Sequence, residues 1–441
     1  MLLLRKNDEY ICENISRNND GELCFAGMPL TPLAEKFGTP LYLYDENRVR
    51  ERCRTYLSAM KEAFGERSRV LYASKAASFR RLYEIMREEG MGIDVVSLGE
   101  IETATVAGYP LEYAYFHSNN KTDHDIEVAI ERGVGCFVVD NEEELISIDE
   151  ISREHSVTSR VLLRITPGID PHTYAAVATG KVDSKFGSAI ETGQADNITR
   201  LALSLENVCL RGFHCHVGSQ VFDSDVYLRA ADVMLQFVAH VNESLGYLAD
   251  ELDIGGGYGV RYVSSHPTID IAANIREVGE YMKQRADELG IRLPEIALEP
   301  GRSIVADAGI TVYTVGTVKR IPGYKTYVSV DGGMTDNPRY ALYNSPYTIL
   351  AVAAHNDSTL ETVSVVGRCC ESGDILQENI MLPSDLRRGD LIACLTTGAY
   401  NYSMASNYNR IPRPPVVMLR EGESYLEVRS VTPQVIVSLD V

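Results

Sequence analysis

The stretch Ile-Ala-Leu-Glu-Pro-Gly-Arg, residues 296–302, is the best starting point for inferring the fold. An apolar segment ends in a carboxylate, Glu299, and the chain then turns at Pro300 and Gly301 beside a cation, Arg302. Loops that follow the carboxyl ends of strands carry the chemistry of α/β enzymes. Because an ordinary loop could have the same composition, the stretch needs support from other parts of the chain.

Two other apolar runs end in reactive side chains. The run Val-Leu-Tyr-Ala-Ser-Lys ends at Lys75, and His-Cys-His ends at His216. A lysine that forms a Schiff base, an anion near a pyridine nitrogen and a histidine stacked on a ring are the parts of a pyridoxal phosphate site. Lys75 alone would be an ordinary loop lysine. Together with Glu299 and His216 it predicts pyridoxal 5'-phosphate as the cofactor.

The composition is typical of a globular protein with two domains. Of 441 residues, 45% are apolar and 24% are charged, so the chain can bury a large core. The net charge of −20 argues against nucleic acid or an anionic membrane as a partner, because both select a basic surface. Nine cysteines without a CxxC spacing predict reduced thiols in the cytoplasm. We expect neither a signal peptide nor a membrane span, because every apolar run is too short.

Strand-like and helical patterns alternate through the first two thirds of the chain. Helical periodicity follows most of the β runs, as in residues 77–89, 124–132, 224–245 and 271–289. Eight β runs over about 260 residues fit a (β/α)8 barrel, and an open doubly wound sheet is the competing fold. The β runs are residues 69–74, 92–96, 113–117, 135–139, 160–165, 210–215, 250–254 and 295–298.

The positions of the polar residues favour the closed barrel. In an open sheet only strands near the switch point carry reactive residues, whereas a closed ring places them after nearly every strand. The runs in this chain end at Lys75, Asp94 with Ser97, Asn119 with Asn120, Asp140, Arg164, His216, Gly255–Gly257 and Glu299. We therefore predict a TIM-type barrel domain over residues 41–305.

The helical period disappears after residue 306. The β runs 311–319, 326–330, 362–366, 391–395, 415–419 and 425–428 are separated by turn residues. They predict an antiparallel β-sandwich or β-barrel domain over residues 306–441. We expect the N-terminal segment, residues 1–40, to add a strand to this domain and to pack with it.

Two motifs in the barrel region have competing interpretations. Asp-Ile-Gly-Gly-Gly-Tyr-Gly, residues 253–259, matches neither a dinucleotide fingerprint nor a P-loop, so it is either a tight turn or a backbone site for one phosphate. In His-Cys-His-Val-Gly-Ser-Gln, residues 214–220, zinc is disfavoured because no third ligand stands at a familiar spacing. We favour an imidazole over a cofactor ring, with Ser219 on its phosphate.

Two further motifs lie in the second domain. Cysteines are often simply buried, but Cys370 is flanked by Glu371 and a glycine turn, so we expect it to be exposed and able to serve as a proton donor. Arg339 offers a planar fork for a carboxylate. Tyr340 and Tyr402 near such motifs are equally compatible with structural roles.

Seven motifs in this order resemble the diaminopimelate decarboxylases, which belong to the alanine-racemase-like class of pyridoxal enzymes. The motifs are YASKA, HCHVGSQ, DIGGGYG, EPGRSIVADAG, VDGGMTDNPRYALY, CCESGD and GAYNYSMASNYN. The resemblance covers the chain from about residue 30 to the end. Each motif alone is weak, but all seven in order are specific.

The resemblance implies a role for each matching residue. Lys75 would carry the cofactor, His216 would stack on its ring, Glu299 would pair with the pyridine nitrogen, and Cys370 would be the acid. The other implied cofactor contacts are Asp94, Arg164, Ser219, Gly256, Gly257, Gly301, Arg302 and Tyr400. The implied substrate contacts are Arg302, Arg339, Tyr343, Glu371 and Tyr400. We predict no metal.

The implied activity is decarboxylation of meso-2,6-diaminopimelate to L-lysine and carbon dioxide, the last step of lysine biosynthesis. The implied active form is a homodimer in which the Cys370–Glu371 segment reaches the partner's barrel. A decarboxylase for ornithine, arginine or a carboxypolyamine is the nearest alternative, and a non-catalytic cofactor-binding protein is the more distant one. Leu98, Ser118 and Tyr174 depart from the usual family pattern and leave the size of the pocket open.

Overall fold

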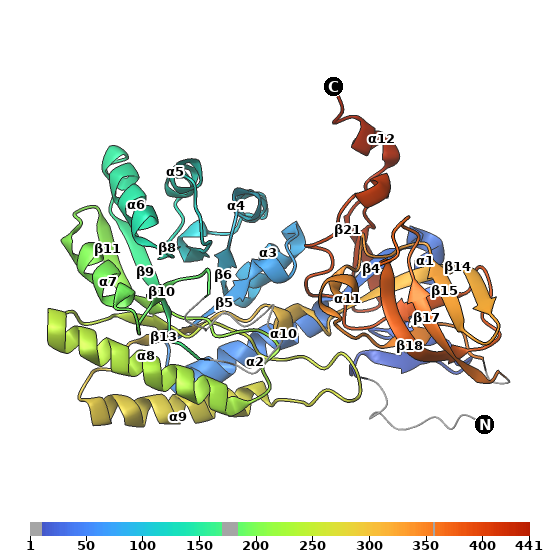
Figure 1. The fold of residues 1–441 in the computed structure, drawn as a ribbon, viewed down its shortest axis with the longest axis horizontal. Helices are drawn as coiled ribbons and strands as arrows, with labels where there is room; N and C mark the ends of the chain where they lie inside the picture. Colours follow the sequence, from blue (N-terminus) through green and yellow to red (C-terminus); the bar gives the residue numbers. More distant parts are fainter. Residues whose placement is uncertain (1–10, 170–183, 356–357) are drawn as a thin grey trace. The chain divides into compact units, whose positions relative to one another are not determined.

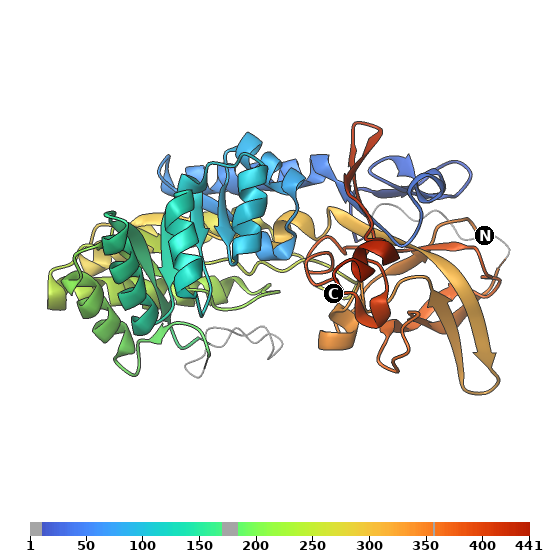
Figure 2. The same cartoon turned by 90° about the horizontal axis from the view of Figure 1, so that it is seen from above.

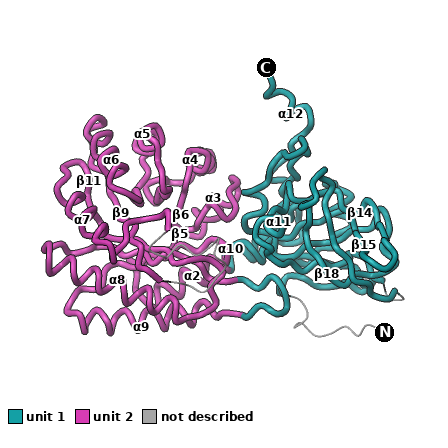
Figure 3. The backbone as a smooth tube through the Cα atoms, viewed as in Figure 1, with its two compact units in different colours: residues 1–51, 260–267, 304–441 teal, residues 52–259, 268–303 magenta. Residues whose placement is uncertain are grey.

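The computed structural model describes residues 11–169, 184–355 and 358–441 (Figure 1). These residues form two compact units (Figure 3). The first unit comprises residues 1–51, 260–267 and 304–441, and the second comprises residues 52–259 and 268–303. The predicted domain limits at residues 40 and 305 stay a prediction. Tyr174 lies outside the described residues.

The second unit is a closed barrel of eight parallel strands, as predicted. The ring closes because β13 pairs with β5 and β8 pairs with β9, so an open sheet is excluded. A short strand, β10 (Ser188–Ala189), adds to β9 outside the ring. The eight strands are β5 (Arg69–Ala73), β6 (Gly92–Val95), β7 (Ala114–Phe116), β8 (Cys136–Val139), β9 (Ser159–Thr166), β11 (Val208–His214), β12 (Glu251–Asp253) and β13 (Glu295–Leu298).

Helices connect these strands. Figures 1 and 2 show α3, α4, α5 and α6 side by side along the outside of the strands, and α8 against α9. The sequence predicted most of them but not α7. Their bounds are α2 (Glu46–Phe64), α3 (Arg80–Glu89), α4 (Leu98–Val106), α5 (Asp123–Arg132), α6 (Glu142–Glu154), α7 (Gln194–Ser204), α8 (Ser224–Leu245) and α9 (Ile271–Leu289).

Local sequence signals explain where these helices begin and end. Thr122 and Asp125 form a capping box at the start of α5, and Gly133 ends that helix in a left-handed conformation. Asn141 caps α6 by accepting from the Glu144 backbone N–H. These caps fix the loops that follow β7 and β8, and so position the strand ends.

The first unit contains a mixed sheet, which corrects the prediction of a purely antiparallel domain. Its main path runs β18-β17-β15-β14-β4-β20-β21. β15 pairs with β17 and β4 with β20 in parallel, because neither pair is joined by a hairpin that would impose the antiparallel direction. The strands are β4 (Leu41–Asp45), β14 (Gly309–Ile321), β15 (Lys325–Val330), β16 (Ile349–Ala351), β17 (Leu360–Val366), β18 (Ile375–Pro383), β19 (Leu391–Cys394), β20 (Val416–Arg420) and β21 (Glu423–Val428).

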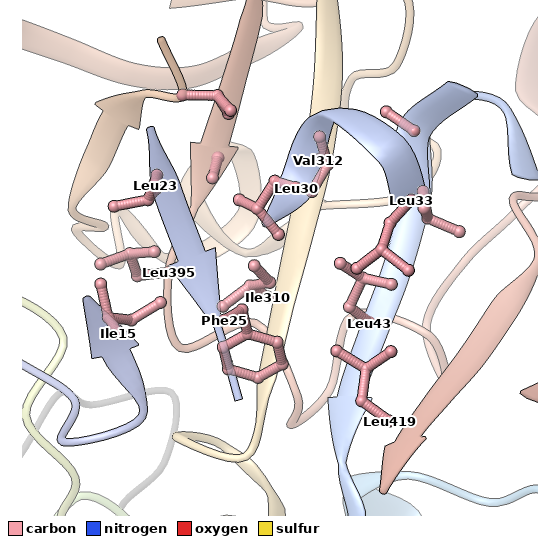
Figure 4. Packing of buried hydrophobic residues seen from close by; sticks show 14 of the residues in the cluster. Ile15, Leu23, Phe25, Leu30, Leu33, Leu43, Ile310, Val312, Leu395 and Leu419 are labelled. Carbon is pink, nitrogen blue, oxygen red and sulfur yellow. The ribbon is translucent and has the colours of Figure 1, made fainter. Parts of the chain in front are cut away.

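The N-terminal segment packs on this sheet. Its strands β1 (Ile15–Arg17), β2 (Leu23–Phe25) and β3 (Met28–Pro29) form a small antiparallel sheet, followed by α1 (Leu30–Phe37). Figure 4 shows its apolar side chains against residues of β14, β20 and the end of β19, in a cluster that includes Ile15, Leu23, Phe25, Leu30, Ile310, Val312, Leu395 and Leu419. Full burial of each such side chain contributes about 1.5–3 kcal/mol. No helix among the described residues is long and apolar enough to span a bilayer.

Candidate active site

The ends of β5 and β13 bring Lys75 and Glu299 to the same part of the barrel. Lys75 lies in the 3-10 turn Ser74–Ala76 directly after β5, and Glu299 follows β13. The two strands are parallel neighbours, and the Ala73 backbone N–H donates to the Pro300 carbonyl at 3.1 Å. The two loops that carry the amine and the carboxylate are therefore held together by their backbones.

Two histidines contact the Glu299 carboxylate, one at each oxygen. His214 Nε2 lies 3.0 Å from Oε2, and His117 Nε2 lies 2.5 Å from Oε1. Glu299 is only 6% exposed, and His214 and His117 are also buried. The sequence missed His117, although the predicted β run 113–117 ends on it, because its neighbours Asn119 and Asn120 form the more conspicuous pair.

These contacts determine the charge of the carboxylate. Burial raises the pKa of Glu299, but His117 and His214 outweigh it and hold that pKa well below its usual range. Burial lowers the pKa of His214 to about 4, so this ring is neutral at pH 7 and donates from Nε2. The buried Nδ1 of His214 has no hydrogen-bond partner in the described parts of the chain, which fits this tautomer.

Asp94 and Arg164 add opposite charges to the same cluster. Asp94 is 1% exposed, and its Oδ1 lies 3.9 Å from His117 Nε2. Burial raises the pKa of Asp94, whereas His117, Lys75 and Arg164 lower it. Burial lowers the pKa of Arg164, against the effect of nearby carboxylates that include Asp94 and Glu299. The cluster therefore combines carboxyl groups, imidazoles and a guanidinium from five strands of the barrel or the residues directly after them.

His216 presents a neutral ring near Lys75. Burial lowers the pKa of His216 well below its usual range, and the charges of Lys75 and Arg164 act in the same direction. The His216 Nδ1 atom accepts from the Gly256 backbone N–H at 3.3 Å, which orients the imidazole. An uncharged, oriented ring is suited to stacking on a flat cofactor.

The glycine loop after β12 fits closely against its neighbours. A Cβ atom at Gly256 would lie 2.1 Å from the Glu299 carbonyl oxygen, so no other residue fits there. Gly257 has φ 109°, and a Cβ atom on it would lie 2.3 Å from the Gly218 carbonyl oxygen. The loop therefore brings its backbone beside Glu299 and the residues after His216, as a phosphate-binding turn requires.

Arg302 and Ser219 form a polar pair beside this loop. The guanidinium of Arg302 donates to the Ser219 Oγ atom from Nη2 at 2.9 Å and from Nε at 3.3 Å. Arg302 is 5% exposed and begins α10 (Arg302–Val305). At Gly301 a Cβ atom would lie 2.9 Å from the Ala73 Cβ atom, which explains the glycine between Glu299 and this cation.

Arg339, a predicted substrate contact, lies between two aromatic rings in the first unit. Its guanidinium carbon is 5.3 Å from the Tyr343 ring centroid and 5.2 Å from the Tyr400 ring centroid. It begins α11 (Arg339–Tyr343) and is 6% exposed. The two rings orient the planar guanidinium group, which we predicted from the sequence to bind a carboxylate.

Asp374 organises the loop that carries Cys370 and Glu371. Both of these residues are exposed, as expected for Cys370. The buried Asp374 carboxylate accepts from the Cys369 N–H at 2.7 Å and from the Met334 N–H at 2.6 Å. Cys370 itself donates its backbone N–H to Asn409 Oδ1 at 2.9 Å. The sequence did not identify Asp374 as the residue that shapes this loop.

The remaining strand-end residues have structural roles or lie beside the cluster. Ser97 caps α4 by accepting from the Glu100 N–H, and Asp140 accepts from the Gly187 N–H at 3.0 Å. Leu98 begins α4, and the Ser118 hydroxyl accepts from the Asn120 N–H at 3.1 Å. A strand-end position alone therefore does not identify a site residue.

Ligand-type atoms converge where the sequence found no third metal ligand. Nitrogens of His117 and His214 and an oxygen of Glu299 lie within 4.8 Å of one another, although they come from three distant strands. Spacing along the chain could not reveal this group. The prediction of no metal stays a prediction.

The closed barrel and the residues at its strand ends define a barrel enzyme of the pyridoxal phosphate type. The family model for the pyridoxal-binding domain of pyridoxal-dependent decarboxylases matches residues 46–306. The chain is 43% identical over 424 residues to a diaminopimelate decarboxylase of Bacillus subtilis, with 96% of each chain covered. The chain therefore belongs to the diaminopimelate decarboxylase family of pyridoxal-dependent decarboxylases.

Solved structures show the same relationship. The diaminopimelate decarboxylase of M. jannaschii in complex with L-lysine aligns with a TM-score of 0.91 and 32% identity, covering 98% of both chains. A lysine/ornithine decarboxylase of Vibrio vulnificus in complex with putrescine aligns with a TM-score of 0.74 and 26% identity, covering 89% of this chain and 97% of that one. The fold thus matches along nearly the whole chain.

Proposed function

We propose that the protein is a pyridoxal phosphate-dependent carboxy-lyase that converts meso-2,6-diaminopimelate to L-lysine and carbon dioxide. This reaction is the last step of lysine biosynthesis. The observation that carries the proposal is the backbone contact between the Lys75 turn and the Glu299 loop, which places an amine and a buried anion at adjacent strand ends. Family membership supplies the reaction class.

The residues present fit pyridoxal phosphate. Gly256 and Gly257 pack so closely on the Glu299 and Gly218 carbonyls that only glycine fits, and Arg302 with Ser219 adds a cation and a hydroxyl to the same strand-end loops. These four residues, with Gly301 and Tyr400, would hold the phosphate. Lys75 would attach the cofactor, and His216 would stack on its ring. Asp94 and Arg164 would make further contacts with the cofactor.

The bound cofactor supplies an electron sink for the charge left when carbon dioxide departs. Glu299 would hold a proton on the ring nitrogen, because its own low pKa makes it the anion of such a pair. Lys75 would supply the amine that attaches the cofactor and would be released as a free amine when the substrate's amino group takes its place. Cys370 holds a proton on Sγ and delivers it to the substrate's α-carbon.

The far end of the substrate carries a carboxylate and an amine, which require opposite charges. Arg339 presents an oriented guanidinium for the carboxylate, with Arg302 as a second cation, and the exposed Glu371 suits the amine. Tyr343 and Tyr400 complete the substrate contacts. Ornithine has no second carboxylate, so it would leave the buried Arg339 guanidinium without an anionic partner from the substrate.

We also propose that the active form is a cytoplasmic homodimer with no nucleic acid or membrane partner. The exposure of Cys370 and Glu371 on one loop is compatible with a segment that reaches the partner's barrel. The net charge of −20 disfavours polyanionic partners. Sedimentation equilibrium of the cofactor-loaded protein measures the dimer; a monomer at micromolar concentration that still turns over would contradict it.

The direct test is lysine formation from meso-diaminopimelate, measured with and without added pyridoxal phosphate. We expect lysine and carbon dioxide in equal amounts only with the cofactor, and much slower turnover of ornithine. Faster turnover of ornithine would support the alternative substrate class. Cofactor binding without any release of carbon dioxide would favour a non-catalytic protein.

A further inference from the structure

The two histidines at Glu299 suggest a role beyond filling space. His117 comes from the end of β7 and His214 from the end of β11, on different sides of β13 in the ring. Each contacts a different oxygen of one carboxylate, at 2.5 Å and 3.0 Å. The side chain of Glu299 is therefore fixed from two directions.

The two contacts differ in geometry. His214 Nε2 is hydrogen-bonded to Glu299 Oε2, whereas His117 Nε2 lies 2.5 Å from Oε1 as a close contact without hydrogen-bond geometry. An imidazole nitrogen thus faces each oxygen of one carboxyl group. A carboxyl group that receives protons from both sides is stabilised as the anion, because a protonated one would have to donate at one of the two oxygens.

We propose that His117 and His214 are positioning residues that hold Glu299 as an oriented carboxylate anion before any partner binds to it. This inference rests on the proposed function, because it assigns the anion to the ring-nitrogen partner of the cofactor. It also explains why two histidines occupy buried strand ends where neither was assigned a contact with substrate.

The residues around this group support the assignment of the charge to Glu299. Burial raises the pKa of two neighbouring carboxyl groups, Asp94 and Asp253, whereas only Glu299 among the three is lowered. Asp253 accepts the Gly255 N–H at 2.7 Å, and the nearby Glu299 adds to burial in raising the pKa of Asp253. The titratable and charged groups that face the cluster are Lys75, Asp94, Arg164, Cys215, His216 and Asp253.

The neighbour Lys121 keeps His117 in place. Its buried ammonium group donates to the Ser118 carbonyl at 3.2 Å, to the Val138 carbonyl at 2.8 Å and to Glu144 Oε1 at 2.8 Å. The loop that follows His117 is therefore tied to the end of β8 and the start of α6. Because this loop is held by hydrogen bonds, the His117 side chain stays in contact with Glu299.

The test measures the ionisation of Glu299 in the cofactor-free full-length protein. Isotope-edited infrared spectroscopy with ¹³C-labelled glutamate separates carboxylate from protonated carboxyl bands, and Glu299→Gln assigns the Glu299 signal. In the wild type we expect an ionised Glu299 at pH 7. In His117→Phe and His214→Phe we expect the titration midpoint to rise by about one pH unit, and further in the double variant.

A conservative variant separates positioning from packing. His117→Gln keeps an N–H donor, so we expect it to retain most of the wild-type midpoint, whereas His117→Phe only fills the space. His240→Phe is the matched control, because His240 Nε2 also contacts a carboxylate, Asp196 Oδ1 at 2.7 Å, but at an exposed position. Circular dichroism melts of the single variants establish that each is folded.

Cofactor affinity gives a second readout. We expect the dissociation constant for pyridoxal phosphate to rise about tenfold in His117→Phe and to stay near the wild-type value in His117→Gln. An unchanged Glu299 midpoint in both folded single variants would overturn the proposal. That failure is distinct from failure of the proposed function, which lysine formation by the wild type tests independently.

Discussion

Glu299 and Cys370 are the two proposed proton-handling groups, and the protein surrounds them in opposite ways. Glu299 is buried and fixed by side chains from separate strands, whereas Cys370 is exposed on a loop held by backbone hydrogen bonds to Asp374 and Asn409. Burial works against a charged carboxylate, so Glu299 needs specific partners. The exposed thiol of Cys370 needs only a loop with a fixed backbone conformation. The barrel site therefore depends on electrostatics and the loop site on backbone geometry.

The largest expected effect comes from the barrel side of this comparison. Lys75→Ala removes the amine that attaches the cofactor, so we expect loss of the visible absorption band of the bound cofactor and a fall in turnover of about a thousandfold or more. Absorption spectra and lysine assays measure both. The control, Lys61→Ala, removes an exposed lysine paired with Glu66 and should change neither. A variant that keeps the band would place the attachment on another lysine.

Cys370→Ala tests the proposed proton donor on the exposed loop. We expect turnover to fall about a hundredfold while cofactor binding is unchanged, because general acid catalysis contributes on that scale and the thiol has no assigned cofactor contact. Cys209→Ala removes another exposed cysteine and should behave as the wild type. Equal turnover in both variants would remove Cys370 from the acid role.

Asp374→Asn tests whether the backbone geometry of the Cys370–Glu371 loop matters for turnover. The Cys369 and Met334 N–H groups donate to different oxygens of Asp374, and an amide has only one acceptor oxygen, so one of the two contacts is lost. We expect turnover to fall about tenfold with an unchanged dissociation constant for the cofactor. Asp390→Asn, which weakens one loop contact to the Arg387 N–H, is the control. A cofactor affinity that falls with turnover would contradict a role confined to this loop.

The smallest effect concerns a buried carboxyl group that lacks the partners of Glu299. Burial raises the pKa of Asp336 to about 8, from an unfolded value of about 3.9. Its protonated form therefore stabilises the fold fully below about pH 4, and this contribution is lost as the pH rises to about 8. Asp336→Asn stays neutral. Between pH 5 and 8 its melting temperature should therefore fall by about 2–4 °C less than that of the wild type.

Calorimetry at both pH values measures this difference. Asp20→Asn, at an exposed position of the same unit, should follow the wild type. The same pH slope in Asp336→Asn and in the wild type would show that Asp336 is ionised in the folded protein.

Much of the fold could be predicted because parallel strands and amphipathic helices leave periodic signals. The predicted run 295–298 coincides with β13, and the predicted helices 224–245 and 271–289 coincide with α8 and α9. β18 was missed because Gln377, Glu378 and Asn379 interrupt its apolar residues. The parallel pairing of β4 with β20 was also missed, because strands so distant along the chain have no local signal for direction.

The predicted site residues are those that carry family motifs or end an obvious β run. Lys75, His216 and Glu299 were predicted in this way, and their roles stay a prediction. His117 and Asp374 were not, because their roles arise from contacts with residues far away in the sequence. Spacing along the chain identifies groups with intrinsic reactivity, but it does not identify the residues that orient them.

The central claim is that Lys75 and Glu299 act on one cofactor. A crystal structure of the protein after incubation with pyridoxal phosphate tests it most directly. We predict electron density that joins the cofactor to Lys75 Nζ, with the Glu299 carboxylate at hydrogen-bond distance, about 2.7–3.0 Å, from the ring nitrogen. A cofactor attached to a different lysine, or a ring nitrogen without a contact to Glu299, would contradict the account.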